Sequence, residues 1–249
     1  MTNINCMGLV LKTQPIGERD KRVTVLTDSI GLIHCFARGA QSIGGRLMSA
    51  TQPFAYSAMT LFQRKESYSL DHADIDKLFM AVSIDIAKLS LVQYFAQAVI
   101  AHAPREEDAR ETLRLLLNCL HFLNGDQMEP AIVKVVFEFQ LMKLCGYQPL
   151  LEECGSCGEQ REEGLYFFSL SEGILRCEAC AQTRREEECV LPPPILKALR
   201  HVSGDLSKAF FFQLPGEQLS YLGDIGERYL QYHSERRYET LDYYKSMNG

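Results

Sequence analysis

Four cysteines in the second half of the chain have the residue type and spacing of a metal site. Cys154 and Cys157 form one CxxC pair, Cys177 and Cys180 form another, and nineteen residues lie between the pairs. Each pair can sit on a tight turn and present two thiolates to one tetrahedral Zn²⁺. The intervening segment is typical of two short strands around Ser171-Glu-Gly173. We therefore expect a zinc finger at about residues 150–185, with these four cysteines as ligands of a structural Zn²⁺.

Three other interpretations of these cysteines compete with this one: a redox pair, a catalytic zinc and four free core thiols. A redox CxxC occurs once, at a strand-to-helix junction in a βαβ unit, whereas two matched pairs occur here. A catalytic zinc usually keeps three protein ligands and a position for water, whereas four thiolates complete the shell. Cys189 is either a bystander, which we favour, or an alternative ligand. The remaining cysteines lie in apolar surroundings and are expected to be core thiols: Cys6, Cys35, Cys119 and Cys145.

The sequence lacks the motifs that mark common catalytic sites. It contains no G-x-x-x-x-G-K-[ST], G-x-S-x-G, H-E-x-x-H or G-x-G-x-x-G. Its six histidines are scattered, and a single histidine on a helix face is more often a packing residue than a catalyst. We therefore expect a protein that is not an enzyme.

The charge of the chain is unevenly distributed. The net charge is −6 and the pI is about 5.6, which argues against a wholly basic nucleic-acid binder. Residues 1–80 nevertheless hold nine Lys/Arg against seven Asp/Glu, a balance of +2 that leaves −8 for the remainder. A nucleic-acid face is therefore permitted in the first third of the chain.

The hydrophobic pattern divides the chain into a strand-rich part and a helical part. From Gly8 to about Phe79, short apolar runs alternate with turn residues, as in a small closed barrel of the OB type. Helical spacing follows, and helices are expected from about Leu89 to Pro104, from Glu106 to about Leu123, from Pro130 to Gly146, after Leu191, and from Glu217 to about Arg237. The segment from Tyr238 to Gly249 is expected to be frayed.

The expected fold is thus α+β with two domains. Residues 1–80 would form an OB-fold β-barrel, and residues 81–249 a mostly α-helical domain that carries the inserted four-cysteine zinc finger. No signal peptide and no apolar run long enough for a bilayer are apparent, so we expect a cytoplasmic protein with reduced thiols.

This order of parts resembles the RecO family of bacterial DNA repair proteins. In the body, the run from Phe137 to Tyr147 precedes Cys154 as the family's helix precedes its cysteine site. In the first domain, the resemblance rests on Gly8-Leu-Val-Leu-Lys, Gly17-Glu-Arg-Asp-Lys-Arg-Val-Thr-Val-Leu-Thr27, Gly31-Leu, Arg38-Gly-Ala40 and Gln52-Pro-Phe54. It covers nearly the whole chain.

The resemblance implies a noncatalytic protein of homologous recombination in the RecF pathway. Such proteins bind single- and double-stranded DNA and anneal complementary strands. With RecR, and in many bacteria RecF, they help to load RecA onto DNA coated with single-strand-binding protein (SSB). The alternative left open is a zinc-containing OB-fold protein that binds RNA or serves as an adaptor without annealing.

Candidate DNA contacts follow from the resemblance and from the needs of an OB fold. A cationic groove holds phosphates, and aromatic rings stack on bases. Arg38 is the best single candidate because it matches a basic position of the family. The available rings are Phe36, Phe54, Tyr56, Phe62 and Tyr68, although the barrel core is the commoner place for any one ring. The candidate DNA-binding cations are Arg19, Lys21, Arg22, Arg38, Arg46, Arg64 and Lys65.

Two further expectations concern partners and affinity. The acidic, apolar tail of SSB would need a pocket rimmed by cations, for which Arg110, Arg114 and Lys134 are candidates, although a plain solvated helix is the commoner explanation of the first two. After Arg38 the family usually continues with several basic residues, whereas residues 41–47 provide only Arg46. We therefore expect DNA binding with a shallow dependence on salt.

Overall fold

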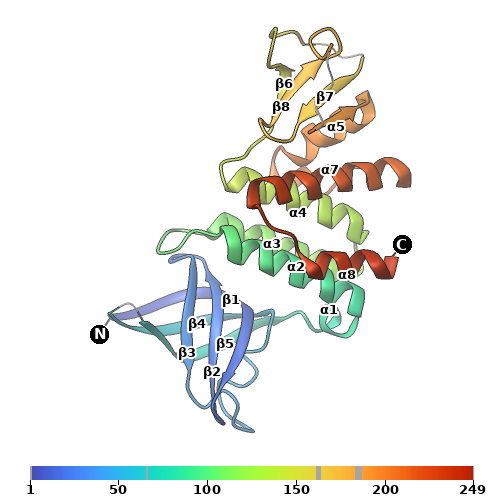
Figure 1. Ribbon diagram of the computed structural model, residues 1–249. Coiled ribbons are helices and arrows are strands. Elements are labelled where there is room, and N and C mark those ends of the chain that lie inside the picture. Colours follow the sequence, from blue (N-terminus) through green and yellow to red (C-terminus); the bar gives the residue numbers. More distant parts are fainter. Residues whose placement is uncertain (1, 66, 161–163, 183–186, 249) are drawn as a thin grey trace. The chain divides into compact units, whose positions relative to one another are not determined.

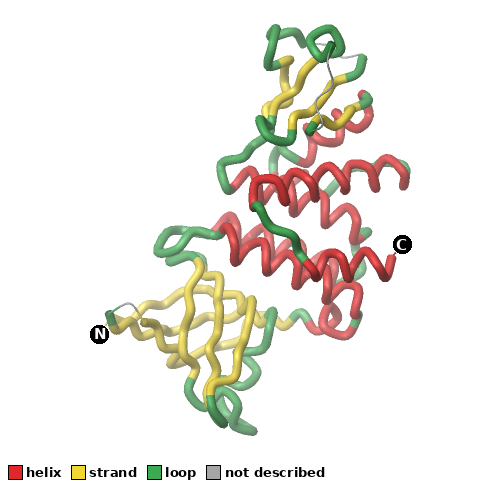
Figure 2. The backbone as a smooth tube through the Cα atoms, viewed as in Figure 1, coloured by secondary structure: helices red, strands yellow, loops and turns green. Residues whose placement is uncertain are grey.

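The computed structural model describes residues 2–65, 67–160, 164–182 and 187–248 of the 249-residue chain. It divides the chain into two compact units (Figures 1 and 2). Unit 1 comprises Met1–Gly125 together with Tyr238–Gly249, and unit 2 comprises Asp126–Arg237. No helix among the described residues is long and apolar enough to span a bilayer.

The first five strands of unit 1 form a β-barrel. They are β1 (Thr2–Ile16), β2 (Asp20–Thr27), β3 (Leu32–Ala37), β4 (Ala55–Arg64) and β5 (Ser67–Leu78). The strands pair in the order β1-β2-β3-β5-β4, and β4 pairs back onto β1. The β3–β5 pairing is parallel, and the other four pairings are antiparallel. Buried and exposed side chains alternate along β3 and most of β4, so one face of each strand fills the barrel core.

The connection between β3 and β4 covers residues 38–54 and contributes to this core. Ala40, Leu47 and Ala50 are buried in the same cluster as the barrel side chains. Thr51 is also buried, and its hydroxyl donates to the carbonyl of Leu47 at 2.7 Å. The connection is therefore anchored although it contains no strand or helix.

Helices complete unit 1: α1 (Met80–Ile84), α2 (Ile86–His102), α3 (Arg110–Asn124) and α8 (Glu239–Asn248). The α2 helix confirms the predicted helix before Pro104, and the carboxylate of Asp85 caps it by accepting from Lys88 N at 3.1 Å. The α3 helix begins four residues later than predicted. The preceding segment instead bonds to the β2–β3 turn, where Ala109 N donates to Asp28 O at 3.0 Å.

The expectation of a frayed segment after Tyr238 is wrong. Residues of this segment form α8, in which Leu241 is fully buried. The ring of Tyr238, just before the helix, packs edge-on against Tyr94 of α2 with a centroid distance of 5.1 Å. The hydroxyl of Thr240 donates to the side chain of Gln97 at 3.1 Å. Buried apolar side chains thus outweigh the usual tendency of chain ends to fray.

Unit 2 combines helices with a small sheet. Its helices are α4 (Pro130–Leu144), α5 (Pro193–Val202), α6 (Leu206–Ala209) and α7 (Gly216–Ser234). Its strands are β6 (Leu150–Cys154), β7 (Tyr166–Ser169), β8 (Ile174–Cys177) and β9 (Glu188–Leu191), paired in the order β6-β8-β7-β9. The β7 and β8 strands confirm the predicted hairpin around Ser171-Glu-Gly173. The α7 helix ends three residues before the predicted Arg237, and the next residue, Glu235, has a positive φ of 49°.

The expected domain boundary at residue 80 remains a prediction. The last barrel strand ends at Leu78 and the first helix begins at Met80, but the compact units divide the chain elsewhere. Within the predicted zinc finger at about residues 150–185, residues 161–163 and 183–185 lie outside the described part of the chain.

Candidate functional site

The four predicted cysteine ligands lie together in unit 2. The sulfurs of Cys154, Cys157, Cys177 and Cys180 all lie within 4.8 Å of one another, and those of Cys157 and Cys177 are 3.8 Å apart. Four sulfurs held tetrahedrally at the usual Zn–S distance of about 2.3 Å would be about 3.8 Å apart. The described geometry therefore fits a metal ion with four thiolate ligands.

Hydrogen bonds of the sheet hold the first CxxC turn. Gly158 N donates to Cys154 O at 2.8 Å, and Gly155 N donates to Leu175 O at 2.8 Å, which ties the turn to β8. Gly158 has a positive φ of 71° that favours glycine. A side chain at Gly155 would come within 2.9 Å of Ile174. The two glycines therefore allow the turn to lie close to β8.

A buried ion pair holds the second CxxC turn. The guanidinium of Arg176 donates through Nη1 to Glu188 Oε1 at 2.5 Å and through Nη2 to Cys180 O at 2.5 Å. Glu188 lies on β9, so the pair connects the turn to the edge of the sheet. Cys180 N also donates to Cys177 O at 2.9 Å.

The electrostatics of the cluster favour a bound cation. Burial alone would raise the pKa of Cys154, but donors that include the backbone N–H groups of Cys177, Cys157 and Ser156 outweigh burial and lower that pKa to about 6. The neighbouring sulfurs of Cys157 and Cys177 raise the pKa of Cys180 to about 12. Ionising all four thiols without a cation is therefore unfavourable, and a divalent ion would offset the repulsion.

The other cysteines are not part of this cluster. Cys189 is buried, and its sulfur accepts from Arg228 Nη1 at 3.3 Å, as expected of a bystander. Burial raises the pKa of Cys6 to about 11 and that of Cys35 to about 12. Cys119 is fully buried, and burial raises its pKa further still. These three thiols are core residues, and their burial favours the protonated form.

A row of side chains crosses the outer surface of the barrel in unit 1. Arg22 on β2 is the register partner of Phe36 on β3, which pairs with Ser69 on β5, which in turn pairs with Phe62 on β4. Their sequence neighbours, such as Val23, fill the barrel core, so the members of the row point outward. Phe36 is 45% exposed and Phe62 is half-buried. We call Arg22, Phe36, Ser69 and Phe62 the aromatic row.

The spacing of the row suits unstacked bases. Neighbouring strands lie about 4.8 Å apart, so the backbones that carry the two rings, which are two strands apart, are separated by about 10 Å. Ser69, which pairs with both phenylalanines in the register, carries a small side chain. Aromatic rings on a barrel surface can stack on bases of a single strand without reading its sequence.

Cations lie on both sides of the aromatic row. Arg38 follows Phe36 by two residues, and Arg64 follows Phe62 by two residues. Because β3 is parallel to β5 and β4 is antiparallel to it, Arg38 and Arg64 lie on opposite sides of the row. Both arginines and Lys65 are exposed.

A second group of predicted cations belongs to the connections at one end of the barrel. Arg19 on the β1–β2 turn and Arg46 on the β3–β4 connection are accessible to solvent. The β1–β2 turn is tied to the β3–β4 connection, because Gln41 N donates to Arg19 O at 2.9 Å. Lys21 is half-buried, and its Nζ donates to Thr51 Oγ1 at 3.3 Å, so it is less available to DNA than its neighbours.

Among the candidate rings, burial separates surface from core. Phe54 and Tyr68 are buried in unit 1, so they serve packing and cannot stack on bases. Tyr56 is half-buried, and burial raises the pKa of its hydroxyl. The sequence identified both rings as candidates. It could not show that Phe36 and Phe62 lie in one row, because β3 and β4 do not pair with each other and each pairs with β5.

The structure corrects one candidate for an SSB-tail cation. Lys134 is buried in unit 2, and its Nζ contacts Glu138 Oε1 at 2.9 Å, Gly223 O at 3.0 Å and Glu227 Oε2 at 3.6 Å. It therefore cannot be a cation on the rim of a surface pocket. Arg110 and Arg114 in unit 1 are accessible to solvent, and they pair with Asp108 at 3.0 Å and with Glu111 at 3.7 Å.

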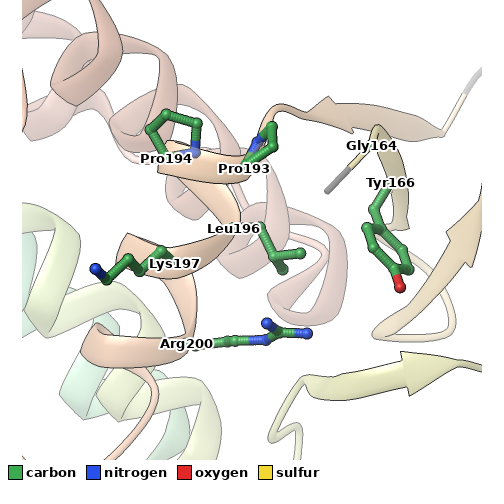
Figure 3. A pocket seen from close by; sticks show the side chains of 7 residues that line it. All are labelled: Gly164, Tyr166, Pro193, Pro194, Leu196, Lys197 and Arg200. Carbon is green, nitrogen blue, oxygen red and sulfur yellow. The ribbon is translucent and has the colours of Figure 1, made fainter. Parts of the chain in front are cut away.

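A pocket of about 570 Å³ lies between α5 and the small sheet of unit 2 (Figure 3). Leu196 and Arg200 extend from α5 toward Tyr166, whereas Lys197 points away. Arg200 donates through Nε to Leu151 O at 2.8 Å, so it ties α5 to β6. The lining residues provide no pair of acid and base, and we assign no ligand to this pocket.

Two family models together match nearly the whole chain. The family described as Recombination protein O C terminal matches residues 84–242, and the one described as Recombination protein O N terminal matches residues 1–79.

Individual relatives are similar over most or all of their length. A protein of Acetivibrio thermocellus is 28% identical over 249 residues, which cover 100% of this chain and 98% of the relative. One of Thermoanaerobacter sp. is 26% identical over 247 residues, with 97% of each chain covered. One of Alkaliphilus metalliredigens is 29% identical over 177 residues, covering 71% of this chain and 72% of the relative. All three are described as DNA repair protein RecO.

Proposed function

Because this chain belongs to the RecO family of DNA repair proteins, we propose that it is a noncatalytic recombination mediator. It binds single- and double-stranded DNA and anneals complementary strands. Together with RecR, and with RecF where that protein takes part, it helps to load RecA onto SSB-coated DNA in the cytoplasm. The observation that carries the proposal is the aromatic row with cations on both sides.

The barrel supports the DNA-binding part of this proposal. The strand order β1-β2-β3-β5-β4, with β3 parallel to β5, is that expected of an OB fold. OB folds bind oligonucleotides on the face of strands 2 and 3 and with the loops that join strands 1–2 and 4–5. Here Arg22 and Phe36 lie on that face, Arg19 on the first loop, and Arg64 and Lys65 at the second.

The charges near the row support modest rather than strong phosphate binding. The exposed carboxylate of Asp71 lies near Arg38, because each directly follows one of the register partners Leu70 and Ala37. A carboxylate in this part of the barrel reduces the number of phosphates that the surface can neutralise. We therefore retain the expectation that affinity for single-stranded DNA changes little with salt concentration, because few counterions are released.

The cysteine cluster supports a structural role for Zn²⁺ in unit 2. Cys154, Cys157, Cys177 and Cys180 would hold the ion, which would fix the two CxxC turns to the sheet. Four thiolates leave no position for water, so the ion would stabilise the fold rather than activate a nucleophile. Its loss would unfold the small sheet first.

Annealing of SSB-coated strands tests the proposal. Two complementary oligonucleotides carrying a fluorescent donor and acceptor are coated with SSB, and the chain is expected to accelerate energy transfer between them. Phe36→Ala and Arg38→Ala should slow annealing, with loss of one base stack costing about 1–3 kcal/mol of single-strand affinity. Tyr243→Ala on α8, another exposed ring, is the matched control and should have no effect. Binding without annealing would support an RNA-binding or adaptor protein instead.

For the SSB tail, Arg110 and Arg114 remain the proposed cations. Reversing both charges to glutamate should weaken binding of a peptide with the acidic, apolar character of that tail. Unchanged binding would remove both arginines from the site. The buried Lys134 takes no part in this proposal.

A further inference from the structure

We propose that Ile43, at the tip of the β3–β4 connection, inserts against exposed bases at the junction between duplex and single-stranded DNA and unstacks the terminal base pair. The inference rests on the proposed DNA-binding function and assigns a separate role to one apolar residue. Ile43 is 99% exposed and belongs to the run Gln41-Ser-Ile-Gly-Gly45. A β-branched apolar side chain so fully in water contributes nothing to the stability of the fold.

The tip that carries Ile43 is held in place by the rest of the connection. Ala40 and Leu47, which lie on either side of it, are buried in the barrel core. Ser42 N donates to Gly39 O at 3.1 Å, and Gly45 N donates to Ser42 O at 2.8 Å, so the intervening turn is closed by its own backbone. The exposure of Ile43 is thus imposed by a folded turn.

A second connection braces this turn. Gln41 Nε2 donates to Gly17 O at 3.2 Å and to Asp20 O at 2.6 Å, which fixes the tip to the β1–β2 turn. The carboxylate of Asp20 also accepts from Gly39 N at 2.8 Å. We call Ile43 in this role the wedge. A wedge that separates stacked bases must be held rigidly, because a mobile turn would be displaced by the bases instead.

The surroundings of Ile43 identify nucleic acid as the partner. Arg38 and Arg46 lie on the same connection, and Arg19 lies on the turn to which Gln41 binds. All three are accessible to solvent, so the segments that hold the apolar tip also carry cations that can contact phosphates. Apolar side chains within a cationic setting are the means by which proteins separate stacked base pairs. If Ile43 instead bound an apolar surface of another protein, the three arginines around it would have no role in that contact.

The proposal predicts that different residues determine the affinity for DNA and the unstacking of its bases. The arginines supply most of the affinity through phosphates, whereas Ile43 acts only on the stacking of bases at a junction. The experiment uses the full chain and a duplex with a single-stranded overhang. A fluorescent adenine analogue, whose emission rises when it unstacks, occupies the last base pair of the duplex.

Saturating wild-type protein should raise the emission of the analogue. Ile43→Ala and Ile43→Ser should lose most of that rise while the dissociation constant changes by about threefold or less, since phosphate contacts remain. Ile43→Leu should keep the rise because it keeps an apolar side chain. Ile84→Ala on α1 is the matched control, since Ile84 is also an isoleucine with 79% exposure, and it should behave as the wild type.

The possible failures are distinguishable. A wild-type protein that does not bind this DNA would refute the proposed function and the wedge together. DNA binding without any rise in emission, or a full rise with Ile43→Ser at saturation, would overturn the wedge and leave the proposed function intact. Loss of binding to a protein partner in Ile43→Ala, with the rise retained, would also overturn it.

Discussion

Replacement of Lys134 by methionine is expected to destabilise unit 2 strongly. The ammonium lies between the α4 and α7 helices, and the side chains of Lys134 and Glu138 are 9% and 0% exposed. Gly226 of α7 makes room for the carboxylate, since a Cβ there would lie 2.7 Å from Glu138 Oε2. Methionine keeps most of the volume but removes the charge.

The magnitude follows from the burial of the partners. Removing one member of a buried ion pair costs about 3–5 kcal/mol, because the remaining charge is left in a medium of low dielectric constant. In Lys134→Met, the carboxylate of Glu138 keeps its burial and loses the ammonium that lies 2.9 Å from Oε1, and the carbonyl of Gly223 loses a donor. The free energy of unfolding, measured by urea titration and far-ultraviolet circular dichroism, should fall by this amount.

Two comparisons make the result decisive. The double variant Lys134→Met with Glu138→Leu removes the ammonium and its nearest carboxylate and should recover most of the loss, since apolar side chains can replace a buried pair. The third charge, Glu227, lies farther from Lys134, at 3.6 Å, and its side chain is 12% exposed. Arg114→Met breaks the exposed pair with Glu111 and should cost less than about 1 kcal/mol. A loss in Lys134→Met no larger than that in Arg114→Met would refute the reasoning.

Three further changes test other parts of the fold. Cys177→Ser removes one ligand of the proposed zinc site, so it should lose the metal ion that we expect in the wild type, measured by mass spectrometry under native conditions, and it should lower the melting temperature. Lost annealing in a variant that stayed fully stable would instead assign the metal a direct role. Leu241→Ala should cost about 2–5 kcal/mol in urea unfolding because this side chain of α8 is fully buried, whereas a frayed segment would show no change. Burial lowers the pKa of His233 below the ordinary 6.5, and its ring stacks on Tyr147 at 4.3 Å. The folded state therefore favours the neutral form of His233, so the contribution of this residue to stability is full above pH 6.5 and is lost as the pH falls below 6.5. His233→Phe should make the free energy of unfolding less dependent on pH in this range. One proton changes that free energy by at most about 1.4 kcal/mol per pH unit.

The parts that the sequence predicted correctly depend on local spacing. The two CxxC pairs lie on short turns joined by one hairpin, so the cluster of Cys154, Cys157, Cys177 and Cys180 follows from neighbours in the chain. Alternating apolar residues likewise predicted the strands of the barrel. The metal's identity and the DNA-binding role of the surface arginines stay predictions.

The parts that were missed depend on contacts between distant segments. The aromatic row depends on the parallel pairing of β3 with β5, for which the sequence has no local signal. The burial of Lys134, in contrast, has a local signal in the sequence. It stands four residues before Glu138 in a helix that is apolar on all sides, and such a helix is usually buried. The α8 helix has few apolar residues. It is ordered because Leu241, and Tyr238 just before the helix, pack against the other helices of unit 1, and the sequence has no local signal for this packing.

The return of α8 to unit 1 has a consequence for synthesis on the ribosome. Unit 1 is made of two stretches of chain, and Asp126–Arg237 is translated between them. The ribosome therefore completes unit 2, including its four cysteines, before Leu241 emerges to finish the helical layer of unit 1. Since domains can fold as they leave the ribosome, unit 2 could take up the proposed metal ion before unit 1, which contains the barrel, is complete. If the proposed zinc site is correct, a shortage of zinc would affect unit 2 while unit 1 of the nascent chain still lacks α8.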